Sequence, residues 1–176
     1  MGGIDDRGVH SGLLIRSIMV MYDITSGSIF DTFRGNAVTG PLAERGLVLE
    51  QASVITTTWA AWRTAHPETT VLVQALALGR NPDFRNGRDA DGPIFPVGDV
   101  DPRLGVHDDV IGVIAASGTP WAFERGDALL ALAGGESIEV ENIRVVMDGG
   151  GLRAEDTGGG GLSGHEAFWF AWSLLY

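Results

Sequence analysis

Short apolar stretches separated by turn-forming residues run through most of the chain. Residues 13–24 are rich in Ile, Val and Met and are apolar on both faces, which is typical of a buried strand. The turn cluster DITSGS at 23–28 precedes a second strand at 29–35, so the pattern predicts a hairpin over 13–35. Residues 47–57 predict a further strand pair or one bent strand.

A helical pattern follows these strands. Either Thr57 or Thr58 suits the N-cap, and residues 59–65 suit a short helix. His66 stands before Pro67, and a residue before proline is disfavoured in the α region. The helix is therefore expected to end at His66.

The second half of the chain returns to strand patterns. Residues 69–78 predict a strand, and 109–125 predict a hairpin around a Ser-Gly-Thr-Pro turn. Residues 126–135 fit either one helical turn or a short strand. The apolar phase jumps by three at 141–142, which predicts a tight hairpin over 137–148.

Glycine-rich and proline-rich segments predict the loops. Residues 79–107 are dense in Gly, Pro, Asn and Asp, which predicts a long loop, and long loops often carry function. Residues 149–164 predict a Gly-rich loop. Residues 165–176 are apolar and aromatic and are expected to be buried. We expect a flexible N-terminal segment at 1–12 and a single β-rich domain over 13–176.

Together these elements predict a mostly β fold. The expected architecture is a Greek-key sandwich or a distorted barrel of short strands, with one short helix and long loops. The length of 176 residues and a hydrophobic fraction of 44% are sufficient for one domain with a core.

Charge narrows the range of partners. The formal net charge is -11, all 12 basic residues are arginine, and the sequence pI is about 4.6. Nucleic acid and anionic membrane surfaces need clustered cations, so neither is an expected partner. The arginine-only usage fits a GC-rich genome, and the acidity also fits adaptation to salt.

No apolar run is long enough for a membrane span, and the start of the chain lacks the apolar region of a signal peptide. We therefore expect a soluble chain, without an assigned compartment. The opening Met-Gly-Gly also fits a missing native N-terminus. The absence of cysteine excludes disulfides, thiolate zinc sites and cysteine nucleophiles.

Histidines are the first candidates for a divalent-metal site. The chain has four of them: His10, His66, His107 and His165. No two have the local spacing that places imidazoles at one site, although the fold can bring them together. His107 precedes two aspartates and His165 precedes a glutamate, which allows mixed ligation. We consider His66, His107 and His165 as metal ligands, and surface or capping histidines as the alternative.

Other catalytic patterns are incomplete. The sequence has no G-x-S-x-G elbow, although Ser163 lies close to His165. The paired carboxylates at 89/91 and 99/101 do not complete a calcium loop, and we interpret them as an acidic solvated surface. The tract at 158–161 lacks the lysine of a phosphate-binding loop.

Several stretches resemble a known family. They are MVMYDITSGSIFDTFRGNAVTGPLAERGLVLE, TTTWAAWRTAHPETTVL, FPVGDVDPRLGVHDDVIGVI and FWFAW, in this order. Over most of residues 11–176 the chain resembles the bacterial and archaeal family catalogued as domain of unknown function 3179. Members carry an upstream Cys-Pro-Leu-Cys-Gly-like motif that looks redox-active or metal-binding. The cysteine-free chain resembles the downstream part of the domain, and the resemblance implies no known substrate.

The residues that carry the resemblance supply the ligand-site candidates. These are Tyr22, Asp23, Trp59, Trp62 and His66. Trp59 and Trp62 lie three residues apart on one helical face, where they line a groove or belong to the core. His66 is either a ligand or base, or a structural group at the helix end.

Three functional hypotheses follow. The first is a β-rich module that binds a small-molecule ligand or a partner. The alternative is a metal-dependent (copper or zinc) oxidoreductase or hydrolase that uses His66, Asp23 and another histidine. The third is a shortened relative that folds as a homo-oligomer through exposed strand edges.

Overall fold

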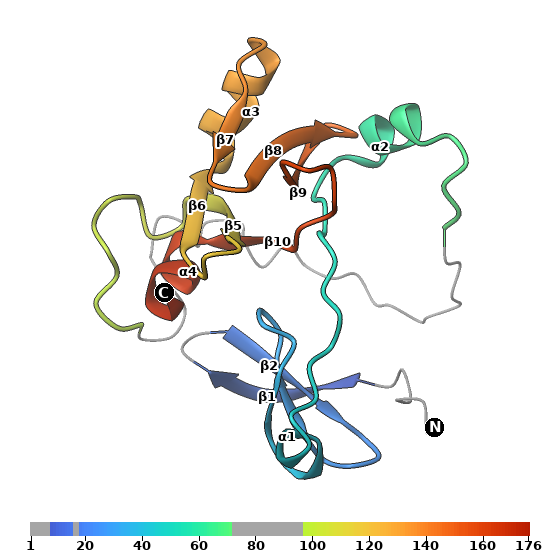
Figure 1. Cartoon of the computed structure of the whole chain (residues 1–176), viewed down its shortest axis with the longest axis vertical. Coiled ribbons are helices and arrows are strands. Elements are labelled where there is room, and N and C mark those ends of the chain that lie inside the picture. The colour runs from blue at the N-terminus through green and yellow to red at the C-terminus, as the bar shows by residue number, and fades with distance from the viewer. Residues whose placement is uncertain (1–7, 16–17, 72–96) are drawn as a thin grey trace, which may run out of the picture. The chain divides into compact units, whose positions relative to one another are not determined.

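The computed structural model describes residues 8–15, 18–71 and 97–176 as antiparallel strands and short helices (Figure 1). The strands are β1 (Gly8–Ile15), β2 (Ile18–Asp23), β3 (Ile29–Asp31), β4 (Ala37–Thr39), β5 (Asp109–Ile114), β6 (Pro120–Glu124), β7 (Ile138–Val140), β8 (Ile143–Asp148), β9 (Gly151–Asp156) and β10 (Gly164–Phe168). The helices are α1 (Pro41–Glu44), α2 (Trp59–Ala65), α3 (Arg125–Ala133) and α4 (Trp169–Leu175). The mostly β prediction is confirmed, although the described residues form four short helices and not one.

Two compact units make up the chain. The residues up to Ala52 form the first unit, and Ser53–Leu174 with Tyr176 form the second. Residues 8–12, expected within a flexible N-terminal segment, lie in β1. The expected single domain over 13–176 stays a prediction.

An antiparallel sheet in the order β1-β2-β3-β4 builds the first unit. The predicted hairpin is confirmed, because β2 pairs with β3 through Val20↔Asp31 and Tyr22↔Ile29. The expected single strand over 13–24 is two paired strands instead. Ile15 pairs with Ile18, so the apolar run folds back on itself and both strands share one sheet.

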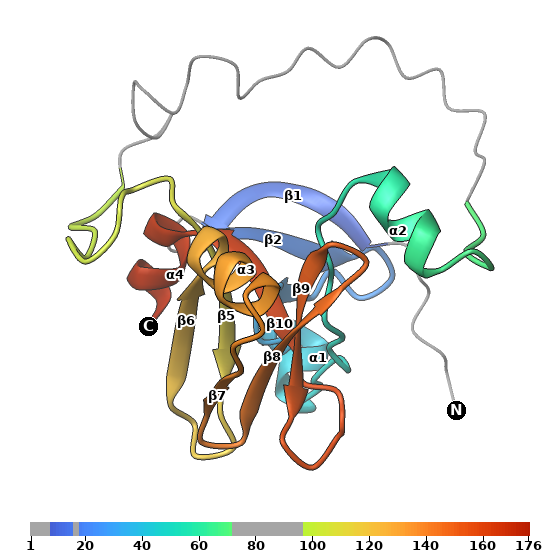
Figure 2. The same cartoon turned by 90° about the horizontal axis from the view of Figure 1, so that it is seen from above.

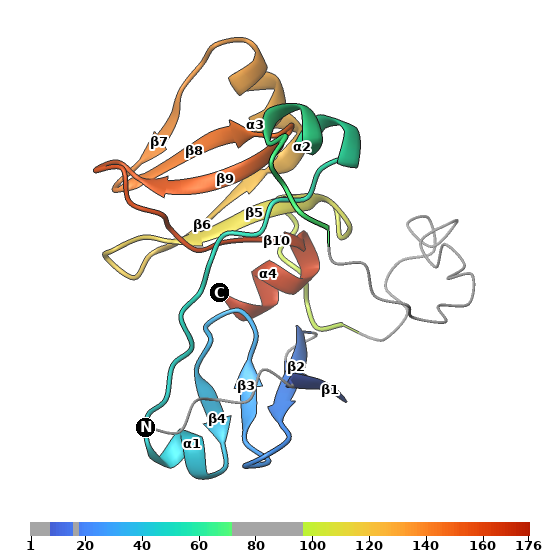
Figure 3. The ribbon, with the colours of Figure 1, turned by 90° about the vertical axis from the view of Figure 1, so that its right-hand side faces the viewer.

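Two three-stranded sheets build the second unit, in the orders β10-β5-β6 and β7-β8-β9. Figure 3 shows the second sheet as a layer over the first, and α3 lies against strands of both (Figure 2). Their common core consists of buried apolar side chains: Ile111, Val113, Ala115, Ala128, Ile143, Val145, Leu152 and Ala154. This core anchors the strand ends that line the clefts described below.

Both hairpins predicted in the second half are confirmed. β5 pairs with β6, and β7 pairs with β8. The turn between β7 and β8 contains Glu141 at φ 51, in the left-handed region that few residues other than glycine adopt. The segment 126–135, whose sequence fits either a helical turn or a short strand, lies largely in α3. Glu124 caps this helix, since its side chain accepts a hydrogen bond from the Asp127 N–H at 2.5 Å.

Two further sequence predictions were wrong. The tract 149–164 is not simply a loop, because it contains β9, whose Leu152 and Ala154 alternate into the core. Gly149 and Gly150 have φ of 55° and 81°, as a two-residue turn between β8 and β9 requires. Residues 47–57 form no strand and make one isolated bridge, from Val48 to Asn36.

The end of the chain, expected to be buried, forms strand β10 followed by helix α4 and is buried only in part, because Tyr176 is exposed. Trp169 and Trp172 are 4% and 3% exposed. The predicted strand at 69–78 and the predicted loop at 79–107 lie largely outside the described residues. Residues 69–71 and 97–107 belong to no helix or strand.

Gly112 of β5 provides a test of this packing. A Cβ at this position would lie 2.2 Å from the ring of Trp172, which has no room to move. We expect Gly112→Ala to destabilise the second unit by about 2 kcal/mol. Urea unfolding followed by tryptophan fluorescence measures this unit, because all five tryptophans follow Ser53. Gly161→Ala is the control, since its Cβ would meet nothing within 4 Å, and equal stability of the two variants would contradict the packing.

Candidate functional site

Helix α2 begins and ends where the sequence predicts. Thr58 is the N-cap, and its hydroxyl oxygen accepts a hydrogen bond from the Ala61 N–H at 3.2 Å. The helix ends at His66, which has φ −127° and ψ 70°, immediately before Pro67. These two ends place the side chain of His66 beside the turn between β8 and β9.

His66 holds α2 against this turn. Its Nε2 lies 2.5 Å from Oδ1 of Asp148, and its ring centroid is 4.0 Å from that of Trp62. Trp62 in turn donates from Nε1 to the Thr69 hydroxyl at 2.9 Å and covers Gly149, where a Cβ would lie 2.7 Å from the indole. The partner of His66 is thus a carboxylate of β8, and the role of His66 as a ligand or base stays a prediction.

Charged side chains extend from this contact along β8 and β9. Asp148 also faces Arg153, with Oδ2 3.3 Å from Nε, and Arg153 pairs with Glu155 at 2.7 Å. His66 is 37% exposed at its side chain, so one edge of the ring remains open to solvent. The carboxylate of Asp148 thus contacts both His66 at the end of α2 and Arg153 of β9.

The three candidate metal ligands lie in different surroundings. His107 packs edge-on against Phe168 and Phe170, with centroid distances of 5.3 and 5.9 Å. His165 has Nε2 3.0 Å from the Ser163 hydroxyl. Across residues 8–15, 18–71 and 97–176, no three His, Cys, Asp or Glu side chains gather as metal ligands would.

Tyr22 and Asp23 lie in β2 of the first unit. The Asp23 carboxylate accepts a hydrogen bond from the Ser26 N–H at 2.7 Å and closes the turn that leads to β3. Hydrogen bonds from the Ser26 side chain and backbone lower the pKa of Asp23 from its ordinary value. The geometry of Asp23 is that of a turn-forming carboxylate. Trp59, by contrast, is half exposed on α2.

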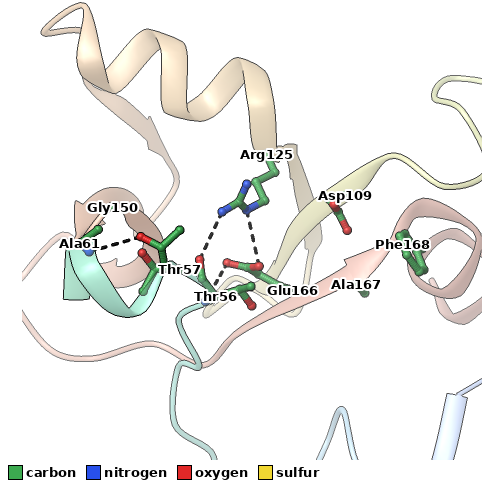
Figure 4. A pocket seen from close by; sticks show the side chains of 10 residues that line it. Thr56, Thr57, Ala61, Asp109, Arg125, Gly150, Glu166, Ala167 and Phe168 are labelled. Carbon is green, nitrogen blue, oxygen red and sulfur yellow. Dashed lines mark hydrogen bonds and ion pairs between the residues drawn. The ribbon is translucent and has the colours of Figure 1, made fainter. Parts of the chain in front are cut away.

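A cleft of the second unit lies at the start of α2. Its volume is about 620 Å³, within the range of roughly 300–1,000 Å³ for small-molecule sites. Figure 4 shows its walls, which come from the segment before α2, from α3 and from strands β5 and β10. The lining includes Thr56, Thr57, Asp109, Arg125, Glu166 and Phe168.

A closed set of contacts stiffens one wall of the cleft. Arg125 donates from Nη2 to the carbonyl of Thr56 at 3.2 Å, and the Thr56 N–H donates to Oε1 of Glu166 at 3.3 Å. Oε2 of Glu166 lies 3.6 Å from Nε of Arg125 (Figure 4). The side chains of Glu166 and Arg125 are 13% and 27% exposed. A largely buried carboxylate is therefore compensated by a cation and a backbone donor.

Asp109 stands apart from this pair. It is directly opposite Phe168 in the β5–β10 register, so both occupy one edge of the cleft. Within the described residues its carboxylate has no hydrogen bond or ion pair, and Figure 4 shows it on the side of Phe168. With Arg125 and Glu166 balanced, the cleft keeps one negative charge.

Sequence reasoning missed Asp109, Arg125 and Glu166 as a set. In the sequence, Asp109 and Glu166 stand out only as neighbours of His107 and His165. Asp109 begins a strand, Arg125 begins a helix, and Glu166 interrupts an apolar segment, so they share no local sequence pattern. Only the long-range pairing of β5 with β10 brings them together. The threonines before α2 were considered only for helix capping.

The fold and the cleft define a β-rich protein with a polar, acidic cavity. A family model described as "Protein of unknown function (DUF3179)" matches residues 8–158. The chain belongs to this family, which confirms the resemblance seen in the sequence. No curated protein and no solved structure matches the chain significantly. None of the helices in the described part has the length and apolar character needed to cross a bilayer.

A double-mutant cycle tests the contact between His66 and Asp148. We expect His66→Ala and Asp148→Asn each to destabilise the second unit and to couple by about 1 kcal/mol, because each removes the same partly buried contact. Urea unfolding at pH 7 gives the four free energies. Additive effects would show that the two side chains act separately.

The turn contact of Asp23 is testable by NMR titration of its carboxyl carbon. The pKa should fall below 3.8, and Ser26→Ala should raise it toward that value, because the Ser26 side chain is the largest cause of the shift. Because the pKa of Asp23 is lower in the folded than in the unfolded state, its carboxylate stabilises the turn at pH values above the unfolded pKa. This contribution is lost as the pH falls through the folded pKa. An unchanged pKa in Ser26→Ala would contradict this assignment.

Proposed function

We propose that this protein is a binding module whose cleft takes a small organic cation, such as an amine, guanidine or quaternary ammonium compound. The observation that carries the proposal is the carboxylate of Asp109, which faces the cleft and has no ion pair within the described residues. An unpaired carboxylate in a partly enclosed space favours a positively charged ligand over an anion.

The neighbours of Asp109 support a cation of organic character. The ring of Phe168 adds an aromatic wall, and an aromatic face attracts cations that have lost part of their hydration. Threonine hydroxyls at 56 and 57 add polar groups on the opposite wall. The Arg125–Glu166 pair supplies stiffness without net charge.

The charge of the whole chain acts in the same direction. A net charge of -11 raises the local concentration of cations and lowers that of anions. The geometry supports a binding module better than the metal-dependent alternative, because the described residues bring no three candidate metal ligands together.

Titration with tetramethylammonium and with methylguanidinium tests this proposal. Chemical shifts followed by NMR should change at Phe168 and at the backbone of Thr56, with saturation at millimolar concentrations. Asp109→Asn should weaken binding about tenfold or more, because it removes the only uncompensated charge among the described lining residues.

Asp99→Asn is the matched control, since it removes one negative charge from an exposed position outside the cleft. Its affinity for both cations should equal that of the unchanged protein. Binding that survives Asp109→Asn, or a preference for inorganic phosphate over both cations, would overturn the proposal.

A further inference from the structure

The three threonines before α2 differ in what their hydroxyls bind. The Thr57 hydroxyl donates to the carbonyl of Gly149 at 2.5 Å. The Thr58 hydroxyl accepts the capping hydrogen bond from the Ala61 N–H. The Thr56 hydroxyl has no hydrogen bond within the described residues, although Thr56 is exposed and lines the acidic cleft. The cleft therefore contains a hydroxyl that can bind a ligand without breaking a contact of the fold.

The guanidinium of Arg125 is only partly hydrogen-bonded. Its Nη2 donates to the carbonyl of Thr56 at 3.2 Å, and none of its other N–H donors has a hydrogen bond within the described residues. Nε is buried without a hydrogen-bond partner in this part of the chain, since the Glu166 carboxylate is 3.6 Å away. The side chain is 27% exposed and lines the cleft, so donors on its Nη atoms remain for a ligand.

These two groups share the cleft with Asp109. Figure 4 shows the guanidinium of Arg125 beside Thr56 and Glu166, with Asp109 on the side of Phe168. A cleft of about 620 Å³ has room for a small molecule that extends from the carboxylate to the guanidinium. Such a molecule meets a negative charge at one end and hydrogen-bond donors at the other.

We propose that the cationic ligand of this cleft also carries an uncharged hydroxyl or carbonyl oxygen, which binds Arg125 and Thr56 while the positive charge lies at Asp109. Amino alcohols and their quaternary ammonium forms have this chemistry. The inference rests on the cation site proposed above, and it specifies the second functional group of the ligand.

The charges around Arg125 favour an uncharged oxygen over a carboxylate. Glu166 already lies 3.6 Å from Nε of Arg125, and Asp109 adds a second negative charge to the lining. A ligand carboxylate would be repelled by both, whereas a hydroxyl accepts a hydrogen bond from Arg125 without adding charge. A ligand hydroxyl also suits Thr56, because each of the two hydroxyls can donate or accept.

The backbone of Thr56 is fixed before any ligand binds. Its carbonyl accepts from Arg125, and its N–H donates to Oε1 of Glu166 at 3.3 Å. The hydroxyl of the next residue, Thr57, is tied to Gly149. This wall of the cleft needs little ordering when a ligand binds, so more of the hydrogen-bond energy contributes to affinity.

Three probes with a trimethylammonium group test this proposal on the full chain: choline, propyltrimethylammonium and betaine. Propyltrimethylammonium has the shape of choline with a methyl group in place of the hydroxyl, and betaine carries a carboxylate. We expect choline to bind about tenfold more tightly than propyltrimethylammonium, because its hydroxyl bonds to the charged Arg125 and to Thr56. Betaine should bind more weakly than choline. NMR titration gives the three dissociation constants.

Thr56→Val tests the hydroxyl on the protein side. Valine keeps the shape of the side chain and the backbone groups that bind Arg125 and Glu166. The variant should bind choline about fivefold more weakly and propyltrimethylammonium with unchanged affinity. Thr70→Val is the matched control, since Thr70 is exposed and outside the cleft, and this variant should bind choline as the unchanged protein does.

Equal affinities for choline and propyltrimethylammonium, or tighter binding of betaine than of choline, would overturn this inference and leave the cation site standing. An equal loss of choline and propyltrimethylammonium binding in Thr56→Val would also contradict it, because the loss would then not depend on the ligand hydroxyl. No binding of any of the three probes or of tetramethylammonium would remove the cation site itself, and the inference with it.

Discussion

The pairing of β10 with β5 is the contact on which the acidic cleft depends. It joins residues more than fifty positions apart, from Gly164↔Val113 to Phe168↔Asp109. This register places Glu166 on the face of Ile111 and brings Asp109 to the edge where β10 ends. It also leads directly into α4, whose Trp172 lies on Gly112. Without this pairing, the acidic cleft loses the walls that β5 and β10 supply.

Glycine residues, which have no side chain, make the close pairing of β10 with β5 possible. A Cβ at Gly164 would lie 2.9 Å from the Ser53 hydroxyl and 3.2 Å from the Ala154 methyl, because strand β10 approaches its neighbours closely there. Gly112 gives the same space to an indole on the other face of the sheet. A sheet packed tightly on both faces fixes the side chains at its edges, which is what preorganised binding walls need.

The local elements could be predicted from the sequence, but the sites could not. Hairpins over β2–β3, β5–β6 and β7–β8 follow from alternation and turn residues, and the end of α2 follows from His66-Pro67. β9 was hidden, because its two inward apolar residues, Leu152 and Ala154, lie within the glycine-rich tract 149–164. The partner of β10 is set by long-range packing, so no pattern around Glu166 indicates Asp109 or Arg125. Propensity and periodicity act over a few residues, whereas the acidic cleft is built from distant ones.

The alternation of β5 decides which side chains reach each face of its sheet. Ile111 and Val113 lie in the core, and Asp109 lies in the acidic cleft at the exposed start of the strand, whereas Gly112 faces Trp172. Successive residues of a strand point to opposite faces, so a slip of one residue would carry Ile111 and Val113 out of the core. It would also place a larger side chain against Trp172, where even a Cβ has no room. The apolar residues that stabilise the fold therefore also keep Asp109 at the cleft.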